Sequence, residues 1–420
     1  MVDFRPILLI LGILLSTLAV MMLIPVFADL VVNHPDWEVF AVASGVTLFI
    51  GVSLSLTSRA GGASLTVRQA FILTTLSWVV LTAFASLPFA FSQLNLSFTD
   101  AFFEAMSGIT TTGSTIIIDL DIAPPGILLW RSLLQWLGGI GIIVMALAVM
   151  PLLRVGGMQL FRMESSDLSE KALPRAAQVA AAISVIYVCL TMIWAALLWF
   201  AGMTGFDAIS HSMTTIATGG FSTHNNSIGQ FNNVLIDYII TVGMIIGSLP
   251  FLLYLMVLQG KSGMLFRDTQ VQWFLTFLVF VIAVVALWLW TINGEHPFQA
   301  IRMAAFNVTS IMTGTGYVTA GFDQWGSFAI PIFFFIMFVG GCAGSTTCGI
   351  KIFRFQVLYA AARIQFQKLI QPHGVFIPYY NHRPIPEEVI SSVMSFFFIF
   401  FATYMCVAIA LGFLGLDFLT

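Results

Sequence analysis

Three segments of this 420-residue chain end in threonines beside a glycine, and these residues are the most able to bind an ion. Threonine offers a hydroxyl oxygen without charge, and glycine permits a positive φ, which turns successive backbone carbonyls to one side. Oxygens of both kinds can replace the water around a metal cation. The candidate segments are 97–115 (SFTDAFFEAMSGITTTGST), 204–223 (TGFDAISHSMTTIATGGFST) and 297–319 (PFQAIRMAAFNVTSIMTGTGYVT).

The three segments share a register. Asp100 precedes Gly113 by thirteen residues, and Asp207 precedes Gly220 by the same thirteen. In the third segment the corresponding polar residue, Gln299, precedes Gly316 by seventeen residues, so this spacing is about one helical turn longer. Because a full apolar stretch stands before and after each segment, the sequence predicts units of helix, short pore helix, loop and helix.

The chemistry of such a unit favours a cation. A short helix that stops inside the membrane aims its negative C-terminal end at the centre of the protein. The loop after it has unpaired carbonyls, which are tolerated at that depth only where they line a cavity or bind a ligand. Four such loops around an axis can replace the hydration shell of potassium. In the competing interpretation the glycines serve only close helix packing.

The elements that must hold these loops are membrane helices. The chain is 59% apolar and 8% charged, with a mean hydropathy of +0.98, which excludes a water-soluble enzyme. A membrane helix needs about 20 apolar residues. We expect eight spans, at 7–30, 39–57, 70–91, 127–153, 179–201, 234–258, 271–292 and 389–412, and a ninth that begins near residue 328 and is interrupted at 340–349 by GGCAGSTTCG.

The basic residues predict the orientation. Of the 16 Lys and Arg residues, fourteen fall on one side, which places the N-terminus in the cytoplasm. The opposite side is acidic, and its acids either form a vestibule that concentrates cations or lie in ordinary solvated loops. These acids are Asp29, Asp36, Glu38, Asp100, Glu104, Asp119, Asp121, Asp207, Asp237, Glu295, Asp323 and Asp417.

Two basic residues lie on the acidic side. Arg131 could attract anions or tune the vestibule. We expect instead that it snorkels to the interface or pairs with Asp119 or Asp121. For Arg302, an acid such as Glu295 is one possible partner. Neither residue is predicted to take part in ion binding.

His211 and His224 flank the second threonine–glycine loop. Their protonation would make the outer mouth sensitive to pH. Ordinary solvated or hydrogen-bonded histidines are the more frequent case, and we expect that case here.

No other set of residues predicts a cofactor. No nucleotide-binding motif of the GxxxxGK[ST] type is present, so any dependence on ATP must act through another subunit. Neither a cofactor nor a nucleic acid is expected as a ligand. Four cysteines form no CxxC pair and predict free thiols rather than a metal site or disulfides, namely Cys189, Cys342, Cys348 and Cys406.

Five motifs resemble the Trk/Ktr/HKT family of potassium transporters, most closely its bacterial TrkH branch. They are TTTGST (110–115), LQWLGGIGIIV (134–144), ATGGFST (217–223), MTGTGYVT (312–319) and FVGGCAGSTTCGIK (338–351). The resemblance covers the whole chain. It implies an all-α polytopic membrane protein in which two leading helices precede pseudo-fourfold helix, pore-loop and helix repeats similar to a potassium channel. It also implies that three quarters of a K⁺ filter are formed by Thr111, Thr112, Gly113, Thr218, Gly219, Gly220, Gly314, Thr315 and Gly316.

The resemblance further implies a gate. In this family the second helix of the third repeat is broken by an intramembrane loop below the filter, and residues 340–349 are similar to that loop. Glycine, serine and threonine hold a regular helix poorly, so the residues alone also favour a break. A kink at a close helix contact is the alternative. The implied gate residues are Gly340, Gly341, Ala343, Gly344, Ser345, Thr346, Thr347, Gly349 and Lys351.

The resemblance also divides the chain. The expected parts are the leading helices (1–68), repeat 1 (69–158), repeat 2 (175–262), repeat 3 (268–370) and the first helix of repeat 4 (385–420). Asp417 lines up with Asp100 and Asp207, so the fourth loop would follow Thr420. We therefore expect a fourth repeat that is cut short.

The implied function is that of the membrane subunit of a potassium uptake system, which conducts K⁺ inward. The implied partners are a second copy, membrane lipids and a cytoplasmic nucleotide-binding subunit of the TrkA type, in the bacterial inner membrane. One alternative is a sodium-coupled symporter, which predicts inverted halves rather than repeats in one direction. Another is a non-conducting, truncated remnant or scaffold. The sequence leaves open whether flux is channel-like or coupled to H⁺ or Na⁺.

Overall fold

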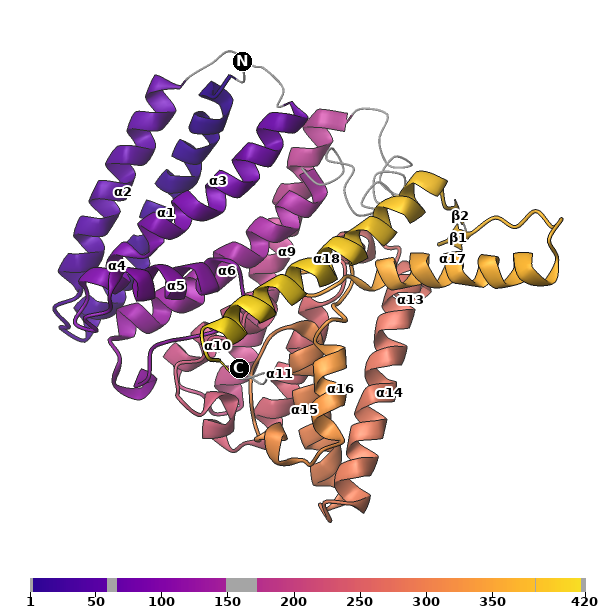
Figure 1. The fold of residues 1–420 in the computed structure, drawn as a ribbon. Coiled ribbons are helices and arrows are strands. Elements are labelled where there is room, and N and C mark those ends of the chain that lie inside the picture. The colour runs from indigo at the N-terminus through magenta and orange to yellow at the C-terminus, as the bar shows by residue number, and fades with distance from the viewer. Residues whose placement is uncertain (1–2, 59–65, 149–171, 382, 417–420) are drawn as a thin grey trace.

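The computed structural model describes residues 3–58, 66–148, 172–381 and 383–416, and most of them are helical (Figure 1). Among these residues seven helices are long and apolar enough to cross a membrane, or eight if one bent pair counts as a single span. The seven are α1 (Arg5–Val31), α2 (Trp37–Thr57), α3 (Val67–Ala85) continued by α4 (Leu87–Phe91), α6 (Pro125–Ala148), α9 (Ala172–Phe200), α14 (Thr269–Thr291) and α18 (Glu387–Phe413). The prediction of an all-α polytopic membrane protein is confirmed.

The span predicted at 234–258 is wrong as a single helix. The chain forms α11 (Val234–Gly247) and α12 (Phe251–Leu258), which are bent by 92° relative to each other. Pro250 stands at the break, and a proline lacks an N–H and disfavours helical backbone in the residue before it. The last residues of another predicted span, 149–153, lie outside the described part of the chain.

Three short helices end inside the molecule. They are α5 (Phe98–Ile109), α10 (Gly205–Ile216) and α15 (Pro297–Thr313), with 12, 12 and 17 residues. Ser97 and Thr204 cap the first two by accepting hydrogen bonds from the backbone N–H groups of Asp100 and Asp207, at 3.2 and 3.1 Å. A carboxylate is stabilised at this positive helix end, which explains why the two acids share a register.

The leading helices α1 and α2 lie side by side (Figure 1). A Cβ atom on Gly12 would lie 2.6 Å from the carbonyl oxygen of Gly51, so only glycine allows this approach. Farther along, the Ser44 hydroxyl donates to the Ala19 carbonyl over 2.7 Å. The Thr47 hydroxyl of α2 also lies 4.0 Å from the Met22 sulfur of α1, so small residues and interhelical hydrogen bonds join the pair.

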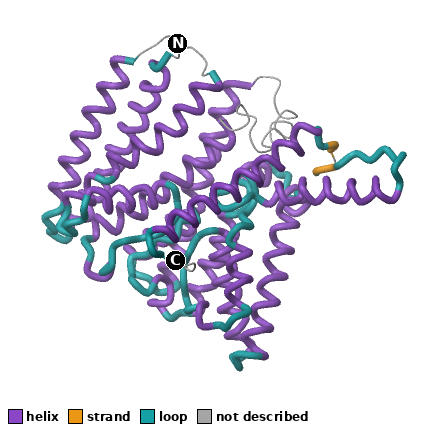
Figure 2. Tube along the Cα trace, in the orientation of Figure 1, coloured by secondary structure: helices purple, strands orange, loops and turns teal. Residues whose placement is uncertain are grey.

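The third repeat is interrupted in its second half. The helix α16 (Ala329–Ile336) ends before residues 340–349, and α17 (Ile352–Ile370) begins after them and runs away from the helix bundle (Figures 1 and 2). A small antiparallel hairpin of β1 (Tyr379–Tyr380) and β2 (Arg383–Pro384) lies beside α17. The remaining elements are η1 (Leu120–Ile122), η2 (Ser227–Phe231), α13 (Gly263–Arg267) and η3 (Phe322–Gln324).

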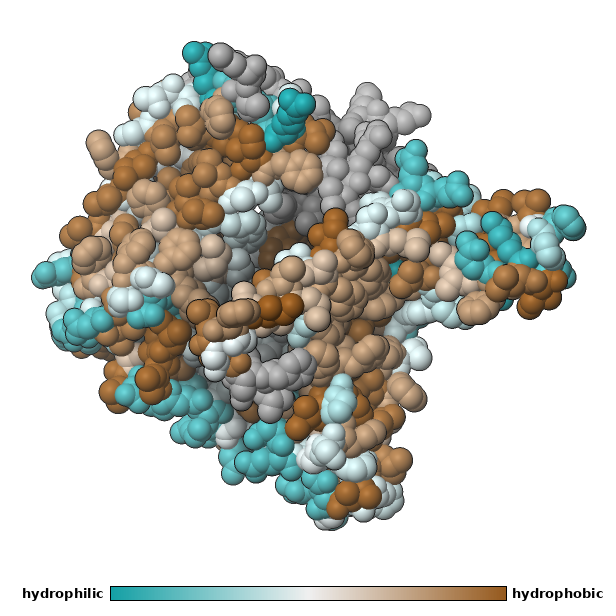
Figure 3. Space-filling view, viewed as in Figure 1, coloured by the Kyte–Doolittle hydropathy of each residue, from teal (hydrophilic) through white to brown (hydrophobic). Residues whose placement is uncertain are grey.

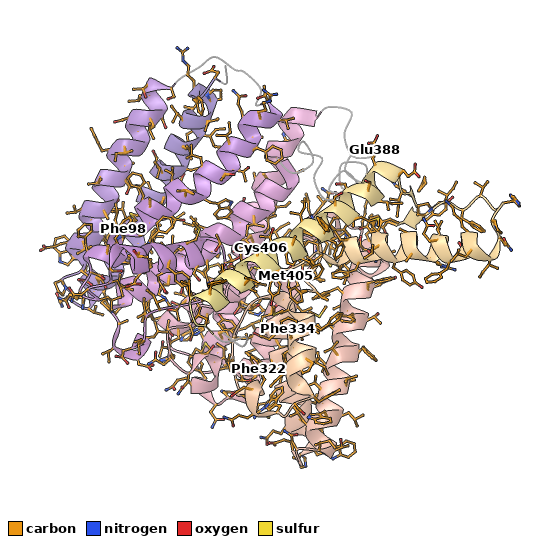
Figure 4. The ribbon with its side chains drawn as sticks, viewed as in Figure 1. Phe98, Phe322, Phe334, Glu388, Met405 and Cys406 are labelled. Atoms are coloured by element: carbon orange, nitrogen blue, oxygen red, sulfur yellow. The ribbon has the colours of Figure 1, made fainter. Side chains whose placement is uncertain are left out.

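The face of the molecule seen in Figure 3 is apolar over its long helices, as lipid contact requires. Hydrophobic residues cover the side formed by α1 to α3 and the length of α18 (Figure 3). Figure 4 shows Glu388 at one end of α18 and Met405 and Cys406 toward the other. The contacts of α18 with the third repeat include aromatic rings packed edge to face, such as Phe338 with Tyr404 at 5.2 Å between ring centres.

Candidate cation filter and intramembrane loop

The three threonine–glycine loops have the same backbone. In each loop the predicted filter glycine has a left-handed backbone conformation, with a positive φ, and so has the residue two positions before it. Such a conformation is costly for a side chain and persists where the surroundings require it. The values of φ are +55° at Thr111 and +86° at Gly113, +48° at Thr218 and +79° at Gly220, and +73° at Gly314 and +84° at Gly316.

The short helices also end alike. In all three, an N–H just after the helix bonds back to the fifth carbonyl before it: Thr112 to Ser107 at 2.9 Å, Gly219 to Thr214 at 2.8 Å and Thr315 to Ser310 at 2.9 Å. This hydrogen bond is typical of a helix end at which the residue just before the N–H donor has a left-handed backbone. The remaining carbonyls at the helix end carry the negative end of the helix dipole, so all three helices favour a cation near their loops.

The loops of neighbouring repeats meet edge to edge. A Cβ atom on Gly113 would overlap the carbonyl oxygen of Gly219, and one on Gly220 would overlap that of Thr315. The backbones of the three loops therefore touch without intervening side chains. Glycine is required here by close approach as well as by φ.

The hydroxyl groups of the loops have different partners. Thr112 is exposed, and its hydroxyl lies 2.8 Å from that of Thr110. Thr315 is buried, and its hydroxyl lies 2.7 Å from that of Thr313. The filter positions thus offer backbone and hydroxyl oxygens but no carboxylate.

The interrupted segment, residues 340–349, lies against all three loops. We call it, together with the next two residues up to the start of α17, the intramembrane loop (340–351). The Cys348 thiol lies 3.7 Å from the Thr111 carbonyl oxygen, and the Thr218 hydroxyl donates to that of Thr346 over 3.0 Å. A Cβ atom on Gly314 would lie 2.8 Å from Cβ of Cys348. Each contact is made at the first left-handed residue of a filter loop.

The two ends of the intramembrane loop are hydrogen-bonded together. The N–H of Gly340 donates to the Ile350 carbonyl, and the N–H of Ile350 donates to the Phe338 carbonyl, both over 2.9 Å. Gly349 has a φ of +72°, and a Cβ atom on Gly340 would overlap the Cys348 carbonyl oxygen. The segment is therefore a closed loop rather than a simple kink in a helix.

The tip of the loop is crosslinked by hydroxyl groups. The Ser345 hydroxyl lies 2.9 Å from that of Thr347, and the Thr347 hydroxyl also accepts from the N–H of Gly341 at 3.2 Å. The Lys351 ammonium donates to the carbonyl and the hydroxyl of Thr347. The N–H of Ala343 donates to the Gln270 side chain of α14 over 3.0 Å.

The break between α11 and α12 receives this loop. The N–H of Phe251 donates to the Gly344 carbonyl over 3.0 Å, and the Gly247 carbonyl accepts from the Thr346 backbone over 3.2 Å. The Thr346 hydroxyl also donates to the carbonyls of Ile216 and Gly247. The backbone groups freed by the bend are thus satisfied by the loop.

Arg131 occupies a different place from the one predicted. It is 1% exposed, and its Nε donates to Glu104, which is 0% exposed, over 2.7 Å. It neither snorkels nor pairs with Asp119 or Asp121. The guanidinium also donates to the Ser222 carbonyl over 2.8 Å, so it lies directly behind the filter loops.

Other outer acids have structural roles as well. Asp29 is buried and accepts from the N–H of Gly126 over 2.6 Å, which caps α6. Arg302 pairs with Asp237 at 3.8 Å rather than with Glu295. Asp417 lies outside the described residues. Asp29 and Asp237 are buried and are therefore not part of an open vestibule.

The two histidines are hydrogen-bonded, as expected. His211 is buried, with Nδ1 2.8 Å from the Asp207 carbonyl and Nε2 3.0 Å from the Ser222 hydroxyl. His224 lies between two acids, 2.7 Å from Asp121 and 3.6 Å from Asp207. Both belong to the packing around the second loop.

Three residues of this region have roles that the sequence did not predict. Cys348 touches the first and third loops, although its only sequence signal is its place inside the predicted gate. Gln135 donates to the Gly219 carbonyl over 2.5 Å and accepts from the Phe221 N–H over 3.0 Å. The sequence feature that pointed to Gln135 was the motif at 134–144. The feature that pointed to Glu104 was its place in the first short helix.

Comparisons with known proteins agree with this geometry. A family model for TrkH, described as a cation transport protein, matches residues 38–419. The Trk system potassium uptake protein TrkI of Halomonas elongata is 42% identical over 99% of this chain and 85% of its own length. The Trk system potassium uptake protein TrkH of Escherichia coli is 37% identical over 99% of this chain and 87% of its own.

A solved structure also matches. The crystal structure of the potassium transporter TrkH from Vibrio parahaemolyticus superposes with a TM-score of 0.91 at 35% identity, over 99% of this chain and 87% of that one. Sequence and fold therefore agree over nearly the whole chain. The chain belongs to the TrkH family of cation transport proteins.

Proposed function

We propose that this chain is the membrane subunit of a potassium uptake system and that its three loops bind K⁺ during passage. The observation that carries the proposal is the shared pair of left-handed residues in three touching loops. The ligands would be backbone and hydroxyl oxygens of Thr111, Thr112, Gly113, Thr218, Gly219, Gly220, Gly314, Thr315 and Gly316. The relatives named above are potassium uptake proteins, which supports the same ion.

The ligand set favours a monovalent cation. Calcium and magnesium are held in proteins by carboxylates together with other oxygens. The filter positions carry no acid, and within the described ranges no group of three His, Cys, Asp or Glu could hold a metal ion. Carbonyl oxygens suit K⁺, which sheds its water at low cost when such oxygens replace it.

We propose that the intramembrane loop is the gate. It lies against the first left-handed residue of each filter loop and is seated in the break between α11 and α12. Conduction would require this loop to move away from Thr111, Thr218 and Gly314. Its glycines and its network of exchangeable hydroxyl bonds suit a segment with two arrangements.

We propose that the protein lies in the bacterial inner membrane with its N-terminus in the cytoplasm, because most basic residues fall on the side that carries the N-terminus. The words "Trk system" in the relatives' names support a multicomponent assembly. We propose a homodimer that binds a cytoplasmic nucleotide-binding subunit of the TrkA type. The repeat boundaries given above are proposed with it. A sodium-coupled symporter with inverted halves is not favoured, because the three loops share one backbone and one chain direction.

Rubidium uptake by cells that lack other potassium uptake systems tests the function. Cells that make the full chain with its partner subunit should take up Rb⁺ in competition with K⁺. Gly113→Ser should weaken the preference for Rb⁺ over Na⁺, because a Cβ there overlaps the Gly219 carbonyl. Gly45→Ser is the control, since nothing lies within 4 Å of a Cβ at Gly45. No Rb⁺ uptake by the unmodified protein would contradict the proposed function.

A further inference from the structure

One position recurs in all three short helices, nine residues before the filter glycine. It holds Glu104 before Gly113, His211 before Gly220 and Asn307 before Gly316. The three side chains are 0%, 0% and 1% exposed. Glutamate, histidine and asparagine share a hydrogen-bonding capacity and little else, so the position requires a buried polar contact.

Each of these side chains holds the segment that follows its own filter glycine. Glu104 accepts from the Thr115 hydroxyl at 3.0 Å and from the N–H of Ile116 at 3.1 Å. His211 bonds the Ser222 hydroxyl at 3.0 Å. Asn307 donates to the Thr319 hydroxyl over 3.1 Å. The outer end of each filter loop is therefore tied to the middle of its own short helix.

The first repeat differs from the other two because its tie is charged. Glu104 pairs with Arg131 of α6 at 2.7 Å, and the guanidinium continues to the Ser222 carbonyl at 2.8 Å. Its central carbon also lies 4.0 Å from the centre of the Phe221 ring. The pair therefore links the outer end of the first loop to that of the second.

Gln135 extends this link. It lies one helical turn after Arg131 on α6, and its amide bonds both the Gly219 carbonyl and the Phe221 N–H. Gly219 is itself a filter position. We call Glu104, Arg131 and Gln135 the filter clamp, since together they hold the backbones of the first and second loops where the two loops touch.

We propose that the filter clamp positions the first two loops and thereby sets the preference of the protein for K⁺ over Na⁺. The clamp residues act through the backbone they hold and are positioning residues. Discrimination depends on where the coordinating carbonyls are held and on how stiffly. This inference rests on the proposed function of the loops as a K⁺ filter.

The test compares Rb⁺ uptake and its inhibition by Na⁺ in whole cells for four single variants. Glu104→Gln and Arg131→Gln should each lower the preference for Rb⁺ over Na⁺ by about tenfold, the scale of one lost hydrogen bond to a charged group. Arg131→Lys keeps the charge but cannot contact Glu104 and the Ser222 carbonyl together as the guanidinium does, so it should lose part of the preference for Rb⁺ over Na⁺. Arg302→Gln is the matched control, since that arginine pairs with Asp237 away from the loops.

The outcomes separate the two proposals. If the unmodified protein takes up no Rb⁺, the filter function itself fails. If it is selective and the three clamp variants keep its preference for Rb⁺ while present in the membrane, the clamp proposal is overturned. If those variants do not reach the membrane, Gln135→Met decides, because it removes the bonds to Gly219 and Phe221 without breaking the ion pair. A lowered preference then supports the clamp, and an unchanged one overturns it.

Discussion

The hydroxyl groups of Thr218 and Thr346 lie 3.0 Å apart and join the second filter loop to the intramembrane loop. Thr218 is one of the left-handed residues of the filter, and Thr346 also binds the break in the neighbouring helix pair. A single side chain thus connects the two parts that a gated pathway must coordinate.

Replacing Thr346 by valine should raise the rate of Rb⁺ uptake. Valine keeps the shape of threonine but loses its bonds to Thr218, Ile216 and Gly247. An intramembrane loop held less firmly should leave the pathway more often. If the closed arrangement loses about 1 kcal/mol of stabilisation, the ratio of open to closed arrangements rises about fivefold. Initial uptake rates at equal membrane abundance measure this. Thr75→Val is the control, because that exposed hydroxyl bonds only within its own helix. A rate that stays at the unmodified value would argue against the gate.

The filter glycines should not be equally sensitive to alanine. A Cβ at Gly220 overlaps the Thr315 carbonyl, whereas nothing lies within 4 Å of a Cβ at Gly316. Both have positive φ, so Gly316→Ala carries only the backbone strain, about 1–2 kcal/mol. We expect Gly220→Ala to abolish selective uptake and Gly316→Ala to reduce it. Equal effects in the uptake assay would mean that the loops do not touch as described.

The buried ion pair should be costly to break. Arg131→Met leaves Glu104 without its cation in a fully buried site, and such losses amount to about 3–5 kcal/mol. Arg302 is partly exposed, so Arg302→Met should cost no more than about 1 kcal/mol. Thermal unfolding of the two purified variants in the same detergent compares them. Similar melting temperatures would contradict the burial of the Arg131 pair.

The cap that α1 supplies to α6 should also contribute to stability. Asp29→Ala removes the acceptor of the Gly126 N–H and should destabilise the protein by about 0.5–2 kcal/mol. Asp29→Asn keeps an acceptor oxygen at the same place and should restore most of the loss. The melting temperatures of the two variants report the difference. An alanine variant as stable as the asparagine variant would exclude a capping role.

The sequence predicted the loops better than their surroundings. The short helices and their register were visible because caps, helix length and glycine act within about twenty residues of chain. The partner of Arg131 was not predictable in the same way. Asp119 and Asp121 are nearer to Arg131 along the chain, but the arginine is held by Glu104, 27 residues away, on a helix whose packing decides the contact.

The bend at residues 247–251 was missed for a related reason. Hydropathy reports that a stretch is apolar and is insensitive to a change in chain direction. Pro250 was the local signal. The loop that fills the bend lies about ninety residues farther along the chain, so its effect appears only once the chain is folded.

The unequal residues at one recurring position have a genetic consequence. Glu104, His211 and Asn307 are encoded separately, so a single codon change alters one wall of the pathway and leaves the others intact. In a ring of identical subunits the same change would occur in every wall at once. A chain built from diverged repeats can therefore adjust its ion preference in smaller steps, one wall at a time.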